Sequence, residues 1–425
     1  MTRVMFIVFI ILLLLGIPIA FVIGISSLVY ILREGMPLVL LAQRFYVSVT
    51  NYLILSVPMF ILAGKLMNES GITRRLVDFF NMILGHIRGG LAYITIVASL
   101  FFAGITGAGA ADAAAIGAIM IPAMKKEGYS AEYSGAVTAV ASIIGPTIPP
   151  SIAMVIYGAS AGVSIAKLFL GGIIPGILIG IAQLIVAYVY SKKHDVPVKA
   201  RNISFAGITR GLKDAILALL MPVILLGGIL SGIFTPTEAA GVSVLYAVVV
   251  GFFVFRELNL KKLFHSLYET ALVTATILFI LAFAHLFGWI LSAEDVPDKV
   301  AQVFIHITNN RFLLLLLINI LFLIVGTFME TLASVILLTP VLLPLAQSIG
   351  LDPVHFGVMM VVALNIGLVT PPLGVCLFVS APIAGVSVER LVLSCLPFIF
   401  ASIVVLLLIT YIPSLVMFIP NLVVK

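Results

Sequence analysis

Apolar runs long enough to cross a lipid bilayer recur along this 425-residue chain from one end to the other. Hydrophobic residues make up 62% of the sequence and charged residues only 9%, which is more apolar surface than a water-soluble fold can bury. Uninterrupted apolar runs of about 18 residues or more are typical of transmembrane helices. The sequence therefore predicts an all-α polytopic membrane protein that lies in a lipid bilayer.

An internal repeat becomes visible when the chain is shifted along itself by 222 positions. At this offset Pro149 and Pro150 align with Pro371 and Pro372, and further glycines and prolines also coincide. The additional aligned pairs are Gly104 with Gly326, Pro122 with Pro344, Gly128 with Gly350, Gly135 with Gly357, Gly145 with Gly367, and Pro175 with Pro397. Interrupted apolar segments at corresponding positions of two halves indicate the binding site of a secondary transporter.

The duplicated prolines predict two helices that are broken within the membrane. A proline in a helix interior costs about 3 kcal/mol, and broken backbone is tolerated at membrane depth only where it lines a cavity or meets a ligand. Free carbonyl groups at a break suit Na⁺, and the N-terminal end of the following half-helix suits an anion. The alternative interpretation is a pair of purely structural kinks.

Two further regions, 89–125 and 311–349, are apolar with Gly-rich or polar centres, and we expect each to form a re-entrant helical hairpin. The remaining apolar runs predict single crossings at 4–32, 51–68, 132–162, 168–190, 214–233, 238–255, 268–291, 354–384 and 391–416. Nine crossings place the two termini on opposite faces. The five crossings that precede the second copy reverse it, so the sequence predicts repeats of inverted topology.

The distribution of charge favours a cytoplasmic N-terminus and a C-terminus on the outer face of the membrane. In this orientation only six of the 23 Lys and Arg residues lie outside, namely Arg33, Arg44, Lys167, Lys299, Arg311 and Lys425. The net charge of +6 is thereby accounted for by membrane orientation, and we expect no nucleic-acid partner.

Several motifs resemble one known family. GITGAGAAD at 104–112, IIGPTIPPS at 143–151, GTFMET at 326–331 and IGLVTPPLG at 366–374 are similar to the large membrane subunit of tripartite ATP-independent periplasmic (TRAP) transporters, and the resemblance covers nearly the whole chain. One departure lies at the first hairpin tip. Many members have serine at two positions there, whereas this chain has Thr106 and Ala108, so a hydroxyl contact at 108 is not carried over.

The resemblance implies an elevator-type transporter of the bacterial inner membrane, driven by a Na⁺ gradient, with no cofactor and no enzymatic activity. It implies two partners, a small four-helix membrane subunit and a periplasmic binding protein that delivers a carboxylate substrate. Sialic acid is our first prediction for the substrate, and C4-dicarboxylates or keto acids are the alternatives. The family's fold would place a scaffold at 1–88 and 191–299 and a moving transport domain at 89–190 and 300–425, with connectors at about 33–50 and 256–267 as interfacial arms.

Candidate binding residues cluster at the breaks and the hairpin tips. Asp112 is the only acid between Asp78 and Glu127, and a carboxylate within a membrane segment is a functional candidate, although it could also cap a helix. The predicted substrate contacts are Thr106, Asp112, Pro149, Ser151, Thr327 and Asn365.

Two Na⁺ sites are predicted, one in each repeat. The first would use backbone oxygens of Gly104 and Gly145 with Ser99 and Thr147, and the second would use Gly326, Gly367, Thr370 and Glu330. Threonine hydroxyls within membrane helices often bond to their own backbone instead, and this interpretation stays open for each threonine.

Other functions remain possible from the sequence alone. A stand-alone ion-coupled anion carrier of the wider elevator class would share the inverted repeats and broken helices but would need no periplasmic protein. A channel would show conductance steps and no saturation. An intramembrane enzyme is not favoured, because the sequence shows no catalytic dyad.

Overall fold

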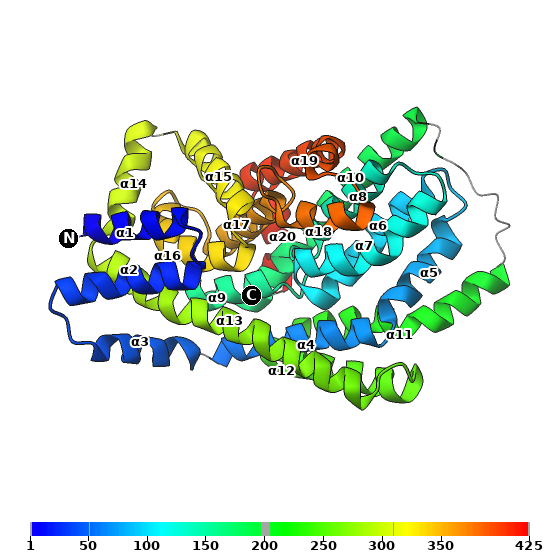
Figure 1. Ribbon diagram of the computed structural model, residues 1–425, viewed down its shortest axis with the longest axis horizontal. Helices are drawn as coiled ribbons and strands as arrows, with labels where there is room; N and C mark the ends of the chain where they lie inside the picture. Colours follow the sequence, from blue (N-terminus) through cyan, green and yellow to red (C-terminus); the bar gives the residue numbers. More distant parts are fainter. Residues whose placement is uncertain (1, 51, 195, 197–204, 309, 424–425) are drawn as a thin grey trace.

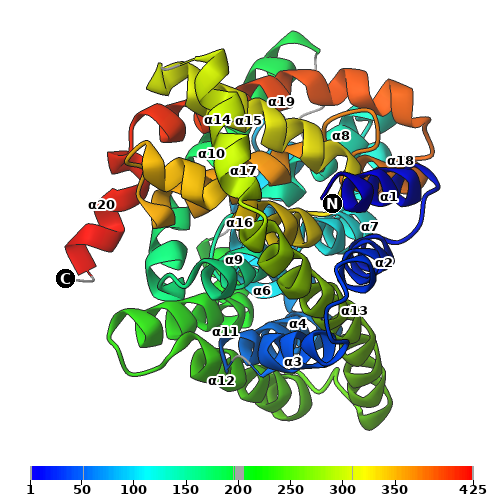
Figure 2. The same ribbon diagram turned by 90° about the vertical axis from the view of Figure 1, so that its left-hand side faces the viewer.

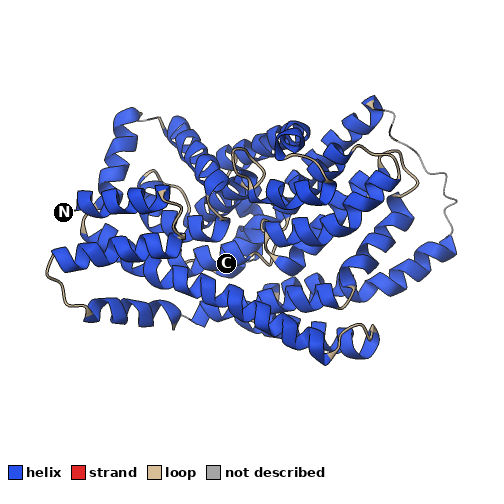
Figure 3. Ribbon diagram, viewed as in Figure 1, coloured by secondary structure: helices blue, strands red, loops and turns tan. Residues whose placement is uncertain are grey.

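The computed structural model describes residues 2–50, 52–194, 196, 205–308 and 310–423 (Figure 1). Within these ranges every regular element is a helix, and Figure 3 shows helices joined by short loops. The first half contains α1 (Thr2–Leu14), α2 (Ile19–Arg33), α3 (Val39–Val49), η1 (Tyr52–Leu55), α4 (Ser56–Glu69), α5 (Ile72–Leu84), α6 (Gly90–Thr106), α7 (Gly109–Lys126), α8 (Ala131–Ala141), η2 (Ser142–Ile144), α9 (Ile152–Ala161) and α10 (Ile165–Lys193). The second half contains α11 (Phe205–Leu230), α12 (Pro236–Val249), η3 (Val250–Val254), α13 (Leu260–Ala293), α14 (Val296–Ile307), α15 (Arg311–Phe328), α16 (Thr331–Ser348), α17 (Pro353–Gly367), α18 (Val375–Ala384), α19 (Val388–Tyr411) and α20 (Ser414–Val423).

The prediction of an all-α protein with several membrane-spanning helices is confirmed. Among the described residues, seven helical segments are long and apolar enough to cross a membrane: Tyr52–Glu69, Ile165–Lys193, Pro236–Val254, Leu260–Ala293, Arg311–Phe328, Thr331–Ser348 and Val388–Tyr411. Two of these segments, α15 and α16, are the arms of the second predicted hairpin. Helix length therefore does not distinguish a re-entrant hairpin from two full crossings, and the re-entrant path stays a prediction.

The single crossing predicted over 4–32 is wrong. Gly16 adopts a left-handed conformation with φ of +72°, and Pro18, which lacks a backbone N–H, begins the next helix. The run therefore forms two helices of 13 and 15 residues, α1 and α2, which pack side by side (Figure 1). Each is shorter than the roughly 20 residues that a membrane crossing needs. The number of crossings and the orientation of the termini consequently stay predictions.

The connector predicted at 256–267 is not a separate element. From Leu260 onward it belongs to α13, a continuous helix of 34 residues that also includes the predicted crossing at 268–291. The other predicted connector, 33–50, contains the separate helix α3, which packs on α13.

The helices pack in two sets. α4 packs on α12, α5 on α11, and both α2 and α3 on α13. The second set joins α6 to α10 with α16 to α20, and it includes the contacts of α10 with α19 and α20 (Figure 2). α13 also contacts α16, so this pair forms one of the borders between the sets.

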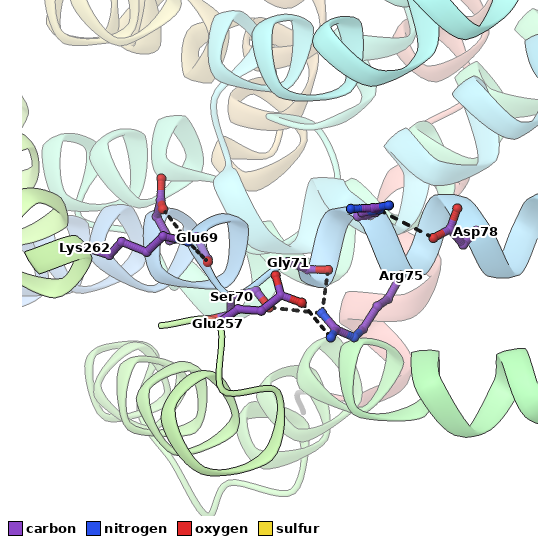
Figure 4. A network of polar contacts seen from close by, with 8 residues as sticks. Glu69, Ser70, Gly71, Arg75, Asp78, Glu257 and Lys262 are labelled. Carbon is purple, nitrogen blue, oxygen red and sulfur yellow. Dashed lines mark hydrogen bonds and ion pairs between the residues drawn. The ribbon is translucent and has the colours of Figure 1, made fainter. Parts of the chain in front are cut away.

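Polar contacts tie the α4–α5 turn to the loop before α13 (Figure 4). The Arg75 guanidinium pairs with Glu257 at 2.7 Å and lies 3.8 Å from the centre of the Phe255 ring, and it also donates to backbone carbonyls of the turn. Lys262 at the start of α13 pairs with Glu69 at 3.4 Å. Because these side chains are partly exposed, each pair contributes only about 0 to 1 kcal/mol, and their main effect is to fix the loop geometry.

The two helices predicted to be broken are interrupted in the structure. The first changes from α8 to η2, loses helical form after Ile144 and resumes at α9, and the second stops at Gly367 and resumes at Val375. α8 packs with α18, whereas α9 packs with α17, so the two broken helices pass each other in opposite directions (Figure 1). This crossing is the arrangement that an inversion of the two repeats requires.

Candidate functional site

The tip of the first hairpin lies against the first break. The chain turns at Gly107, whose φ of +60° suits glycine, between α6 and α7. A methyl group at this position would lie 2.9 Å from the carbonyl oxygen of Pro150. Gly104 lies in the last turn of α6, and the side chain of Thr106 lies outside the described part of the structure.

Asp112 is fully buried in the first turn of α7 and faces the same break. Its carboxylate lies so close to Gly145 that a methyl group there would overlap it. The N-cap residue of α7 is Ala108, so Asp112 does not occupy the N-cap position. A negative charge in the first turn is favoured by the helix dipole. The structure thus brings Asp112 and Gly145, two predicted site residues, into contact.

A side chain within the first break forms hydrogen bonds with the backbone on both sides of it. Ser151 is buried and is the N-cap of α9, where its hydroxyl accepts a hydrogen bond from the Met154 N–H at 3.3 Å and donates one to the Pro146 carbonyl. Pro149 is also buried. Both residues shape the break, and their predicted contact with substrate stays a prediction.

Ser99 is a buried polar residue with unused hydrogen-bonding capacity. It lies in α6, which packs on η2 just before the first break. Among the described residues no group forms a hydrogen bond with its hydroxyl. A buried hydroxyl without a partner is costly, and such a group in a native structure is consistent with an ion or water ligand.

The second hairpin and the second break contact each other through main-chain atoms. A methyl group at Gly326 would lie 2.7 Å from the Leu364 carbonyl oxygen, and one at Gly367 would lie 2.8 Å from the Gly326 carbonyl oxygen. On the far side of the break, the Gly374 N–H donates to the Thr327 carbonyl at 3.3 Å. Glycine at 326 and 367 is therefore required by close approach, in agreement with their selection from the repeat.

Three candidate threonines bond to their own helices. The hydroxyls of Thr147, Thr327 and Thr370 donate to backbone carbonyls three or four residues earlier, at 3.0, 2.7 and 2.8 Å. The local interpretation of these hydroxyls is thus confirmed. Their oxygen lone pairs remain chemically capable of accepting from, or coordinating, another group.

Asn365 connects the two repeats. Its amide nitrogen donates to the Thr147 hydroxyl at 3.2 Å, and its amide oxygen accepts from the Thr331 hydroxyl at 3.0 Å. All three residues are buried. The contact joins the first break, α17 and the start of α16, so Asn365 lies at the point where the predicted site elements meet.

Two cavities open at this meeting point. One of about 40 Å³ is lined by both hairpin tips and both breaks, including Ala108, Pro146, Glu330 and Leu368. The other, of about 180 Å³, lies between the hairpin tips and the helices α4 and α13, and Ala108 and Glu330 line it as well. Among the described residues the Glu330 carboxylate has no hydrogen-bond or ion-pair partner. The arrangement thus presents a free carboxylate to two cavities, the smaller of which is large enough to hold a water molecule or an ion.

Sequence reasoning missed three residues of this site. Lys65 and Asn68 of α4 line the larger cavity, where Lys65 pairs with Glu269 at 2.5 Å. A lysine and an asparagine inside the apolar run at 51–68 are the sequence signals that indicate them. Thr331 directly follows Glu330 in the predicted hairpin tip, and only its contact with Asn365 identifies its role.

Comparison with known protein families gives a match over most of the chain. Residues 6–415 match the model of the family described as "Tripartite ATP-independent periplasmic transporter, DctM component". The chain is 43% identical to an isethionate TRAP transporter permease of Oleidesulfovibrio alaskensis, over 96% of this chain and 64% of that protein's length. It is 40% identical to a sialic acid TRAP transporter large permease of Vibrio cholerae, over 96% of this chain and 95% of the relative. A C4-dicarboxylate large permease of Pseudomonas aeruginosa is 38% identical over 90% of this chain and 89% of the relative.

Solved structures show a related fold at low sequence identity. The YdaH transporter of Alcanivorax borkumensis superposes with a TM-score of 0.59 at 16% identity, covering 90% of this chain and 88% of that one. MtrF of Neisseria gonorrhoeae gives a TM-score of 0.56 at 13% identity, covering 90% and 84%. At these identities the likeness concerns the fold alone.

Proposed function

The chain belongs to the DctM family of tripartite ATP-independent periplasmic transporters as a large permease subunit, and on this premise we propose that it carries a small organic anion into the cytoplasm, driven by a Na⁺ gradient. The single observation that supports this most is the meeting of both hairpin tips and both broken helices around the two cavities at Glu330. The N-terminal ends of the half-helices suit an anionic substrate, and the backbone carbonyl groups beside them suit a transported cation.

Na⁺ is proposed as a transported coupling ion in both repeats. The buried Ser99 hydroxyl without a partner and the Asp112 carboxylate against Gly145 fit a small cation near the first break. Near the second break, the carbonyl-rich contact of Gly326 with Gly367 and the free Glu330 carboxylate fit another. Oxygen ligands of these kinds suit a hard cation.

We propose that transport occurs by movement of one set of helices against the other. The scaffold would contain 1–88 and 191–299, and the transport domain 89–190 and 300–425, with inverted repeats and re-entrant hairpins in the moving part. The two packing sets and the opposite directions of the broken helices support this division.

The substrate is proposed to be a carboxylate or a related organic anion. Relatives are named for sialic acid, C4-dicarboxylates, 2,3-diketo-L-gulonate and isethionate. Their shared chemistry is a small anion, and sialic acid stays our first prediction. A periplasmic binding protein and a small membrane subunit are the proposed partners, and the proposed location is the bacterial inner membrane with a cytoplasmic N-terminus and a periplasmic C-terminus.

Reconstitution tests the proposal. Proteoliposomes that contain this chain, the small subunit and the binding protein are expected to accumulate labelled substrate only with an inward Na⁺ gradient. Omission of either partner is expected to abolish uptake. Full uptake without the binding protein would instead identify a stand-alone carrier, and stepwise conductance without saturation would identify a channel.

A further inference from the structure

A third cavity, of about 250 Å³, lies where α3, α9, α13 and α16 come together, away from the hairpin tips. Its polar side chains are Arg44 of α3, Ser160 of α9, and His285, Trp289 and Ser292 of α13. The rest of its wall is apolar and includes Ile336 and Pro340 of α16. A concave apolar site with a few convergent polar groups is the usual form of a small-ligand site.

Arg44 is the charged group of this cavity. Its guanidinium carbon lies 4.9 Å from the centre of the Trp289 ring. Among the described residues no carboxylate forms an ion pair with it, and the side chain is only half-buried. A guanidinium on an aromatic face keeps its in-plane N–H donors available, and these match a carboxylate or sulfonate in two-pronged geometry.

One face of α13 lines both this cavity and the cavity at Glu330. Val273 and Ile277 line the cavity at Glu330, and Leu281, Ala284 and Gly288 line the Arg44 cavity, at helical spacings of three and four residues. α9 and α16 also border both cavities. Ile152 and Leu332 line the cavity at Glu330, and Ser160 and Ile336, further along the same helices, line the Arg44 cavity. At about 1.5 Å of rise per residue, His285 lies roughly 12 Å along α13 from Ile277.

We propose that the Arg44 cavity is a second anion site, in which the carboxylate of the substrate binds before it moves along α13 to the hairpin tips. This inference rests on the proposed transport function. Arg44 binds the anionic group, Trp289 holds the guanidinium in position, and the hydroxyls of Ser160 and Ser292 accept or donate at the rim.

Trp289 provides a direct test, because it is the only tryptophan in the chain. The purified full chain in detergent is titrated with N-acetylneuraminate, succinate and isethionate, with neutral N-acetylmannosamine as a control, while tryptophan emission is recorded. At least one anion is expected to change the emission in a saturable way, because an anion on the Arg44 guanidinium alters the charge beside the Trp289 ring. Arg44→Gln is expected to weaken this binding at least tenfold.

Arg33→Gln is the matched control, because Arg33 is an exposed arginine at the end of α2 that does not line the cavity. It is expected to leave the titration unchanged. Size-exclusion profiles and circular dichroism of both variants report folding. The proposal is overturned if no anion changes the emission or if Arg44→Gln responds like the wild type. A parallel measurement in nanodiscs of phosphatidylglycerol tests an anionic lipid headgroup as the ligand, and a change seen only there would also overturn the proposal.

Uptake separates this inference from the proposed function. In the complete three-part system Arg44→Gln is expected to raise KM at least fivefold with little change in maximal rate. Normal wild-type uptake with an unchanged KM in the variant would reject the anion site and leave the transport function standing. Absence of wild-type uptake with every substrate, in a system where the binding protein binds its ligand, would reject the transport function itself.

Discussion

At the scale of single residues, one carboxamide holds the two repeats in register. Asn365 donates to Thr147 in the first break and accepts from Thr331 in the second hairpin, and all three side chains are buried. Gly326 and Gly367 act differently, since their missing side chains allow backbone to touch backbone. The site is thus fixed by one shared polar group and by close backbone approach.

Replacement of Asn365 by alanine should lower the free energy of unfolding by about 1 to 3 kcal/mol, because it leaves buried hydroxyls short of partners. Thermal unfolding in detergent measures the change. A double variant with Thr331→Val should show a coupling of about 0.5 kcal/mol or more with Asn365→Ala. Strict additivity of the two changes would show that the observed contact contributes nothing.

Gly326→Ala should reduce uptake at least tenfold. The added methyl group would lie 2.7 Å from the Leu364 carbonyl oxygen and would push the second hairpin away from the second break. Overpacking of this kind typically costs about 1 to 3 kcal/mol. Gly241→Ala in α12 is the control, since nothing lies within 4 Å of its added methyl group. Equal uptake by both variants would contradict the close approach.

At the scale of elements, helix ends are set by local chemistry that can be tested individually. α12 begins with a capping box, in which the Thr235 hydroxyl accepts from the Glu238 N–H at 3.3 Å and the Glu238 carboxylate accepts from the Thr235 N–H at 2.8 Å. Glu238 therefore caps the N-terminus of α12 together with Thr235. The cap fixes where the chain enters α12, which packs along α4.

Thr235→Ala should destabilise the protein by about 1 kcal/mol through loss of this cap. Thr235→Ser is the conservative control and should retain most of the stability, because the hydroxyl is kept. The midpoint of thermal unfolding of each variant provides the measurement. A midpoint for Thr235→Ala that equals the wild type would show that the capping box does not stabilise α12.

Elements were predictable where glycine and proline determine the backbone locally. The breaks at 145–151 and 368–374 and the hairpin turn at Gly107 follow from such residues. By the same rule Gly16 and Pro18 divide the run at 4–32 into two helices. The pairing of Asn365 with Thr147 was beyond prediction, because 218 residues separate them and only tertiary packing brings them together. Glu330 was found as an acid in an apolar region, but its position between two cavities was not.

At the scale of the whole molecule, the central claim is that one set of helices moves against the other. α13 and α16 lie on opposite sides of the proposed border and approach closely at Gly288 and Pro340. A Cβ atom added at Gly288 would lie 3.5 Å from that of Pro340, which is within the range of a disulfide. The two natural cysteines, Cys376 and Cys395, are buried and free.

Uptake by the Gly288→Cys/Pro340→Cys double variant in the complete reconstituted system tests this claim most directly. Oxidation should link α13 to α16 and abolish Na⁺-driven uptake, dithiothreitol should restore it, and each single variant should be insensitive to oxidant. Undiminished uptake by protein that is fully cross-linked would contradict the proposed movement.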